Sequence, residues 1–142
     1  MSFTAFSVGR DTQLVVMGPA GRIDLTYVTS FESHQLTQSV RVSRMDGTHM
    51  GAELPKGWGG SFELDRGNSV VDDFIAAAEQ QYYSGAGPVS GTMYQYITEP
   101  DGSLSTYQYD GVSFRLASSG TWRGDSAVKQ KLEFFAATRR RI

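Results

Sequence analysis

Cysteine is absent from this 142-residue chain, proline is scarce, and neither charge is in marked excess. Without cysteine the chain can form neither disulfides nor thiolate metal sites. No apolar run approaches the about 20 residues that a membrane-spanning helix needs. With 13 basic and 15 acidic residues, the charge is too balanced for a protein that binds nucleic acid by neutralising phosphates. We therefore expect one globular domain over residues 1–142.

Glycine, by contrast, is plentiful, with 16 residues against 4 prolines. This composition suits bends and bulges in β-sheets better than disordered linkers. Most of the chain alternates apolar and polar residues between turn signals, which predicts strands. The first residues lack a basic stretch followed by an apolar one, so we expect no signal peptide.

Strands are predicted in the first half over Gln13–Met17, Arg22–Phe31 and His34–Asp46. Between the first two, Gly18-Pro19-Ala20-Gly21 predicts a hairpin turn, because proline presets φ at the second position and glycine fits the fourth. A further strand, broken by glycines, is predicted over Gly57–Arg66.

Residues 46–57 show neither a helical nor a strand period, and we predict a long loop there. A long loop inside a compact domain is usually functional or disordered. Because the chain has no pocket signature, the first use to expect is contact with a partner. The candidate contact residues are Asp46, Gly47, Thr48, His49, Met50, Gly51, Glu53, Leu54 and Lys56.

A helix is predicted over about residues 69–83. Asn68 or Ser69 can accept a hydrogen bond from an N–H of the first turn. Asp72 and Asp73 fall in that turn, where the helix dipole favours negative charge. Apolar residues recur four apart, so one face is expected to pack on the sheet. This stripe consists of Val70, Phe74, Ala78 and Tyr82, widened by Val71 and Ile75.

Strands return in the second half, over Thr92–Thr98 and Leu104–Tyr109, around the hairpin signal Glu99-Pro100-Asp101-Gly102. Asp110-Gly111 predicts another tight turn, and Ala127–Ala137 predicts the last strand. The predicted fold is mainly β: an antiparallel β-sandwich or barrel-like sheet with one flanking helix.

No set of residues has the pattern of a catalytic or metal site. His34 and His49 share no ligand spacing with each other or with nearby carboxylates, whereas zinc needs three or four converging ligands. Neighbouring carboxylates on a helix diverge, so Asp72 and Asp73 cannot act on one substrate atom. Gly57-Trp58-Gly59-Gly60 lacks the Gly-Lys-Ser/Thr ending of a phosphate loop. We expect no cofactor, no metal and no enzymatic activity.

Five further residues are candidates for contacts between subunits or with partners. Trp58 and Trp122 offer large apolar areas, and ordinary core positions are the alternative. Arg139, Arg140 and Arg141 form the one basic cluster in the sequence and can meet an acidic neighbour. The alternative for the arginines is a frayed, solvated terminus.

Four stretches in the last two-thirds of the chain carry a resemblance to a known family. They are Gly57-Trp58-Gly59-Gly60-Ser61-Phe62-Glu63-Leu64-Asp65-Arg66, Glu79-Gln80-Gln81-Tyr82-Tyr83-Ser84-Gly85, Tyr109-Asp110-Gly111-Val112 and the closing pattern from Gly120 to Ala137. In this order, and at this chain length, they are similar to stretches of bacteriophage tail tube proteins from contractile tails.

The resemblance implies a structural subunit of a phage tail tube, with the β-barrel-like fold already expected. Such proteins form homohexameric rings that stack into a hollow conduit for DNA ejection. The implied partners are further copies, the tail sheath protein, the tape measure protein in the lumen, and baseplate and tail terminator proteins. DNA passes through without specific binding. The implied location is the virion, after assembly in the bacterial host cytoplasm. By position, residues 46–57 correspond to a hairpin or loop that touches the adjacent ring.

The strands over residues 22–31, 34–46 and 57–66 are expected to form the inner sheet, because their polar faces can line a wet channel. The helix is expected outside that sheet. Two alternatives stay open. A secretion-system tube protein shares the architecture, whereas a small β-rich ligand-binding module would be a monomer with a pocket.

Overall fold

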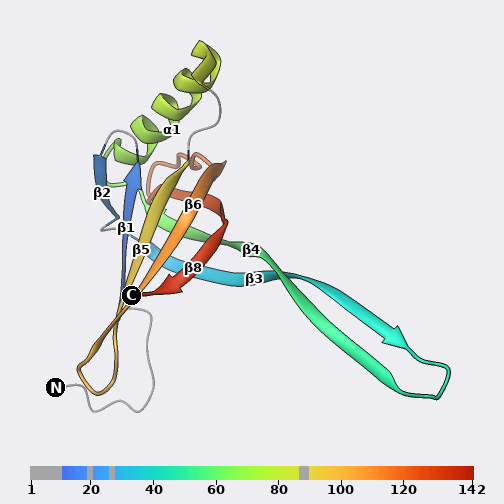
Figure 1. Cartoon of the computed structure of the whole chain (residues 1–142). Coiled ribbons are helices and arrows are strands. Elements are labelled where there is room, and N and C mark those ends of the chain that lie inside the picture. The colour runs from blue at the N-terminus through green and yellow to red at the C-terminus, as the bar shows by residue number, and fades with distance from the viewer. Residues whose placement is uncertain (1–10, 19–20, 26–27, 87–89) are drawn as a thin grey trace.

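The computed structural model describes residues 11–18, 21–25, 28–86 and 90–142, which form mainly antiparallel β-sheet with a single helix (Figure 1). The helix is α1 (Val70–Gln81), followed by a π-helical turn, η2 (Tyr82–Ala86). The strands are β1 (Thr12–Gly18), β2 (Gly21–Leu25), β3 (Val28–Ser43), β4 (His49–Asp65), β5 (Gly91–Thr98), β6 (Leu104–Ser118), β7 (Lys129–Ala136) and β8 (Thr138–Arg141). The predicted fold class is confirmed.

Strand β6 bends and belongs to two layers. Its first part, up to Val112, pairs with β5 and β8, and Ser113–Ser118 pairs with β7. Sheet I therefore has the strand order β2-β1-β5-β6-β8, and sheet II has the order β6-β7-β4-β3. The predicted turn at Asp110-Gly111 is wrong, because the chain bends there without leaving the strand.

The core lies between the two layers. Along β7, alternate residues point inward, which is the period of a strand with one buried face. The buried cluster contains Leu14, Val16, Phe62, Leu64, Val71, Met93, Tyr109, Val112, Leu132, Phe134 and Ala136. Among the described strands β2 and β3 end the order without pairing to each other, so the sheet does not close into a barrel.

Helix α1 packs on the core only through its first half. Val71 is buried and Phe74 and Ile75 are partly buried, whereas Val70 and Tyr82 are exposed. The predicted apolar stripe is therefore right for Val71, Phe74 and Ile75 and wrong for Val70 and Tyr82. The Asn68 side-chain oxygen accepts a hydrogen bond from the N–H of Val70 at 3.1 Å, as one of the two expected alternatives, whereas the side chain of Ser69, the N-cap residue, makes no capping hydrogen bond.

The predicted strand over residues 22–31 is wrong as a single element. β2 ends at Leu25 and β3 begins at Val28, and the two strands lie in different sheets. Alternation continues on both sides of the break, so the period does not reveal it; residues 26–27 lie outside the described residues. The hairpin between β1 and β2 is confirmed by the pairing of Gly18 with Gly21, although Pro19 and Ala20 also lie outside the description.

The predicted loop over residues 46–57 is also wrong. Only a tight turn separates β3 from β4, which begins at His49. Apolar residues do recur at every second position here, at Met50, Ala52 and Leu54. The strand pattern is weak, however, because alanine, glycine and proline in this stretch reduce the difference in hydropathy between the two faces.

Candidate assembly surfaces

The most prominent surface is a two-stranded hairpin that projects from the body of the protein (Figure 1). We call this hairpin, residues 37–55, the arm. At its tip, the N–H of Arg44 donates to the carbonyl of Thr48 at 2.8 Å. The Asp46 carboxylate accepts hydrogen bonds from the hydroxyl and the N–H of Thr48, which lower the pKa of Asp46. The candidate contact residues therefore lie on the tip, on one strand of the arm and at its root.

One face of the arm is polar and satisfies its own hydrogen bonds. Directly paired residues share a face, and Ser39 lies opposite Glu53. The Glu53 carboxylate accepts hydrogen bonds from the hydroxyls of Ser39 at 2.7 Å and Thr37 at 2.8 Å. These bonds, the one from Ser39 first, lower the pKa of Glu53. Ser43 Oγ and His49 Nδ1 lie 3.0 Å apart on the same face.

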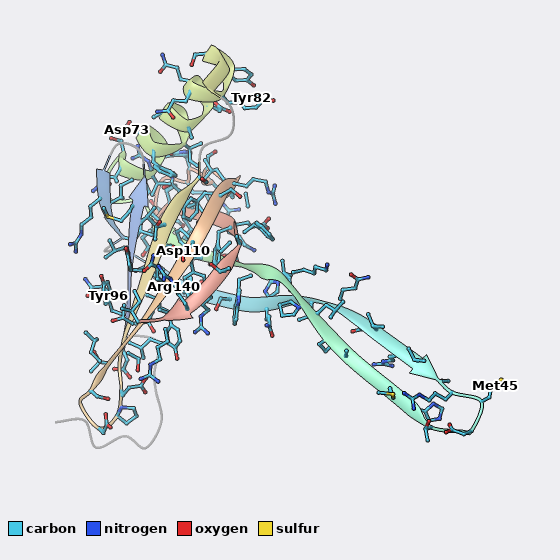
Figure 2. All side chains as sticks on the ribbon, viewed as in Figure 1. Met45, Asp73, Tyr82, Tyr96, Asp110 and Arg140 are labelled. Atoms are coloured by element: carbon cyan, nitrogen blue, oxygen red, sulfur yellow. The ribbon has the colours of Figure 1, made fainter. Side chains whose placement is uncertain are left out.

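The other face of the arm is apolar. Its facing pairs are Val42 with Met50, Val40 with Ala52, and Gln38 with Leu54. Figure 2 shows the arm's side chains standing away from the body of the protein, with Met45 at the tip. A two-stranded hairpin is marginally stable by itself in water. The arm is therefore a candidate contact surface.

The root of the arm is fixed by a glycine. Gly57 has φ +111° and lies at a register shift that begins at Gln35. A Cβ at position 57 would lie 2.8 Å from the carbonyl oxygen of Ala136 on β7. Only glycine fits this combination of φ and close approach, so residue 57 sets where the arm leaves sheet II.

Sheet II offers two strand edges for pairing with another chain. Among the described strands, β3 pairs only with β4, and the second part of β6 pairs only with β7. All neighbours in this sheet are antiparallel, so its two end strands run in opposite directions. Unpaired edges of this kind recruit further strands unless they are covered.

The face of sheet II that points away from the core is mostly polar and mixed in charge, and Phe135 is its one large exposed apolar residue on β7. This face carries the β7 residues that alternate with the buried ones. Each of its three basic residues has an acidic residue on the neighbouring strand. These pairs are Arg115 with Glu133, Lys129 Nζ with Asp65 Oδ1 at 3.3 Å, and Lys131 opposite Glu63.

The basic cluster at the C-terminus is folded onto the protein. The Arg139 guanidinium carbon lies 3.8 Å from the ring centroid of Tyr107 and 4.7 Å from that of Trp58. Arg140 Nε lies 3.1 Å from Asp110 Oδ2, and Arg141 Nη2 donates to Ser105 Oγ at 3.2 Å. The frayed terminus considered above is therefore wrong. All three arginines have partners within the chain.

The two tryptophans differ in exposure. Trp58 is partly buried, packs against the core and carries Arg139 on its ring, so the structure gives it a role within the subunit. Trp122 is 69% exposed, with the Arg66 guanidinium carbon 5.3 Å from its ring centroid. Of the two, Trp122 has more surface left for a contact between subunits.

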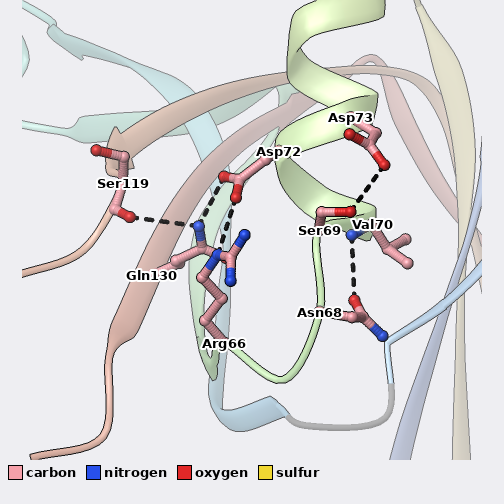
Figure 3. A network of polar contacts seen from close by, with 8 residues as sticks. All are labelled: Arg66, Asn68, Ser69, Val70, Asp72, Asp73, Ser119 and Gln130. Carbon is pink, nitrogen blue, oxygen red and sulfur yellow. Dashed lines mark hydrogen bonds and ion pairs between the residues drawn. The ribbon is translucent and has the colours of Figure 1, made fainter. Parts of the chain in front are cut away.

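A polar network that the sequence analysis missed joins α1 to sheet II (Figure 3). Asp72 Oδ2 lies 2.9 Å from Arg66 Nε, and Asp72 Oδ1 accepts a hydrogen bond from Gln130 Nε2 at 2.8 Å. Gln130 also donates to the carbonyl of Ser119 at 3.3 Å and is only 1% exposed. The one signal in the sequence was a glutamine at an inward position of an otherwise apolar alternation. Asp72 thus anchors the helix.

No group of three or more metal-ligating side chains gathers within the described residues. His34 and His49 are exposed on β3 and β4. Residues from β1 and the start of β3, with Leu25 of β2 and Gln95 of β5, line an open pocket of about 320 Å³, and none of its described lining residues is ionisable. No described helix is both long and apolar enough to cross a membrane.

No family model matches this sequence, and no curated protein matches it. Solved structures do. A chain in the cryo-EM structure of the PVC sheath-tube complex, an extracellular contractile injection system in its extended state, is similar with a TM-score of 0.68. The identity is 10%, over 99% of this chain and 93% of that one.

Two further structures are similar over the whole chain. A chain of the PVC sheath/tube terminator has a TM-score of 0.67 at 10% identity, covering 99% of both chains. A chain of the anti-feeding prophage cap, described as its tube terminating cap, has a TM-score of 0.66 at 9% identity, over 100% of this chain and 94% of that one. The chain thus shares the fold of proteins from contractile injection systems. The resemblance to contractile-tail tube proteins is supported at the level of fold.

Proposed function

We propose that this protein is a structural, non-catalytic subunit of the tube of a contractile tail, and that it assembles through the edges of sheet II. The observation that carries this proposal is the open, four-stranded antiparallel sheet, whose end strands β3 and β6 run in opposite directions. The shared fold with chains from sheath-tube and terminator structures supports it.

The strand directions allow copies to be added by simple repetition. When the β3 edge of one copy meets the β6 edge of the next, the two strands are antiparallel, as are all others in the sheet. Such a contact joins two different surfaces, so it repeats around a rotation axis and ends only when a ring closes. Closure leaves no strand edge of sheet II exposed and joins the sheets of all copies into one continuous barrel.

The ring that we propose contains six subunits. One of the similar structures, the anti-feeding prophage baseplate, is described as 6-fold symmetrised. Its chain has a TM-score of 0.60 at 8% identity, over 100% of this chain and 97% of that one. Stacked rings would form the tail tube of a bacteriophage virion. The further copies, sheath, tape measure, baseplate and terminator proteins named above would be its partners.

The outward face of sheet II would line the channel. Its basic residues each face an acidic one, so it offers no cluster of cations to phosphates. Strong binding of a polyanion depends on such clusters, because affinity grows with each neutralised phosphate. DNA can therefore pass during ejection without being held. The predicted inner sheet is thereby revised: we place β7 and the second part of β6 beside β3 and β4, and β2 in sheet I.

Disulfide trapping tests the edge contact, because the wild-type chain has no cysteine background. Ser113→Cys on β6 is combined in turn with Ser30→Cys, Glu32→Cys and His34→Cys on β3. In a ring, at least one of these double variants yields an oxidised ladder on a denaturing gel, ending at six subunits. Each single-cysteine variant serves as control and stops at a dimer.

Negative-stain microscopy of the purified wild-type chain provides the second readout. Hollow rods or rings are expected. Rods without a ladder in any double variant would reject the β3–β6 contact. A preparation that stays monomeric at high concentration would reject the tube subunit altogether and favour the ligand-binding module, with the pocket beside β1 as its site.

A further inference from the structure

We propose that Arg115 sets the register in which one copy pairs with the next. Its guanidinium would bridge two carboxylates, those of Glu133 in its own copy and of Glu32 in the neighbouring copy. The inference rests on the proposed function and deepens it, because it names the residues that face each other where two copies meet.

The two faces of sheet II limit the possible registers. Phe114 on β6 and Phe31 on β3 pack against the core, and directly paired residues share a face. The core side of one copy must therefore continue into the core side of the next. The residues that point away from the core are Ser113 and Arg115 on β6, and Ser30, Glu32 and His34 on β3. Matching faces puts Arg115 opposite one of these three β3 residues.

The backbone favours one of these three registers. β6 pairs regularly with β7 over residues 113–116, and β3 pairs regularly with β4 over residues 30–35, with a register shift on each side. Setting Arg115 opposite Glu32 places the regular stretch of β6 against residues 31–34. A displacement by two residues in either direction would set one end of this stretch against a register shift in β3.

The hydrogen-bond pattern of the sheet is compatible with this register. A Cβ at Gly60 would lie against the carbonyl oxygen of Glu32, so this carbonyl points toward β4. Hydrogen-bonded and non-hydrogen-bonded pairs alternate in an antiparallel ladder, so the residues on either side of Glu32 present their N–H and C=O groups at the free edge. Following the alternation across the four strands, the residues on either side of Arg115 do the same. The register thus pairs free backbone groups with free backbone groups.

Charge favours the same register. Glu32 has no ion pair within the described part of the chain. Arg115 contacts Glu133, but its side chain is 70% exposed and its guanidinium carries five N–H donors, enough for two carboxylates. In the other two registers Arg115 would face Ser30 or His34, and neither carries a negative charge.

The disulfide variants described above test the register. Arg115 opposite Glu32 places Ser113 opposite His34 of the neighbouring copy, also as a non-hydrogen-bonded pair. The Cα atoms of such a pair lie about 4.5 Å apart, within the span of a disulfide, whereas a displacement by two residues gives about 8 Å. We expect Ser113→Cys with His34→Cys to form the ladder about tenfold faster than Ser113→Cys with Glu32→Cys or Ser30→Cys.

Charge reversal tests the bridge itself. Glu32→Arg sets two arginines face to face between copies, and should raise the concentration for half-maximal assembly by about tenfold or more at low salt. The increase should shrink at high salt. Glu79→Arg on the exposed surface of α1 makes the same change in net charge, and should leave this concentration within about twofold of wild type. Sedimentation velocity measures both.

A triple variant provides the rescue. Glu32→Arg, Arg115→Glu and Glu133→Arg together reverse every charge of the bridge and keep each attraction. This variant should assemble at a concentration closer to wild type than Glu32→Arg alone. Urea unfolding of each variant shows that the subunit itself is folded.

The outcomes separate this inference from the proposed function. A faster ladder from Glu32→Cys or Ser30→Cys overturns the register and leaves the β3–β6 contact standing. Assembly of Glu32→Arg at the wild-type concentration, or a triple variant that assembles no better than Glu32→Arg, overturns the bridge. A wild-type chain that never assembles overturns the proposed function itself.

Discussion

Arg139 and Tyr107 lie on neighbouring strands, with the guanidinium carbon 3.8 Å from the ring centroid. The same guanidinium carbon lies 4.7 Å from the ring centroid of Trp58 on β4, and Arg139 Nε donates to the hydroxyl of Tyr109 at 3.1 Å. A single side chain thus fastens the last strand, β8, to both sheets.

We predict that Arg139→Ala destabilises the fold by about 1–3 kcal/mol, because it removes a cation–π contact and a hydrogen bond to the buried side chain of Tyr109. Urea unfolding measures this change. Arg140→Ala is the matched control: its ion pair with Asp110 is largely exposed, so its loss should be below about 1 kcal/mol. Equal losses for the two variants would contradict the proposed role of Arg139.

The anchor of α1 makes a second prediction. Asp72→Ala removes the contacts to Arg66 and Gln130 and leaves the buried Gln130 amide without one of its acceptors. The free energy of unfolding should fall by about 2 kcal/mol. Asp73→Ala removes the same charge from the same helical turn, and should lower it by only about 0.5 kcal/mol. Thermal unfolding compares the two variants. If Asp72 acted only through the helix dipole, both variants would lose the same stability, and equal losses would contradict the anchoring role of Asp72.

The root of the arm makes a third prediction. Gly57→Ala places a Cβ 2.8 Å from the Ala136 carbonyl at a positive φ, and should destabilise the protein by about 2 kcal/mol or more. Gly47 at the tip also has a positive φ, +88°, but open space around it. Gly47→Ala should therefore cost less than about 1 kcal/mol. Chemical denaturation compares the two, and a larger loss at position 47 would refute the steric argument.

The polar face of the arm makes a fourth prediction, about pH. The pKa of Glu53 lies below its ordinary value of 4.5, chiefly because Ser39 donates to the carboxylate. Because the pKa of Glu53 is lower in the folded than in the unfolded chain, the ionised carboxylate stabilises the fold. This stabilisation is fully present above about pH 4.5 and is lost as the pH falls through the folded-state pKa. In an NMR titration, Ser39→Ala should raise the pKa of Glu53 toward 4.5. Arg41→Gln, which removes no hydrogen bond to Glu53, should shift it less.

Most of the elements could be predicted from local chemistry. The hairpin signal at Glu99–Gly102 lies between two strands as expected, with the N–H of Gly102 bonded to the carbonyl of Glu99. The errors in the strands and loops have one cause: they fall where an alternating pattern or a glycine is compatible with two structures. Asp110-Gly111 can turn a chain or bend a strand, and at this position the pairing of both halves of β6 decides the outcome.

The candidate sites were predictable only in part. The expected contact segment, residues 46–57, overlaps only the tip and second strand of the arm, and the two faces of the arm become visible only when Val42 is set opposite Met50. The partners of Arg139 lie on β4 and β6, at least 30 residues away in the chain, and no local pattern connects them. Asp72 read as a helix-start residue, although it also anchors the helix to β7.

By itself, the sequence determined that this protein is a cysteine-free, mainly β chain with one helix, since composition, turn residues and side-chain period act over a few residues. Only the tertiary structure decided that β6 joins two layers, that sheet II stays open at β3, and that one face of the arm is apolar and uncovered. These features depend on which strands pair and in which register, and pairing is set by contacts between residues far apart in the chain.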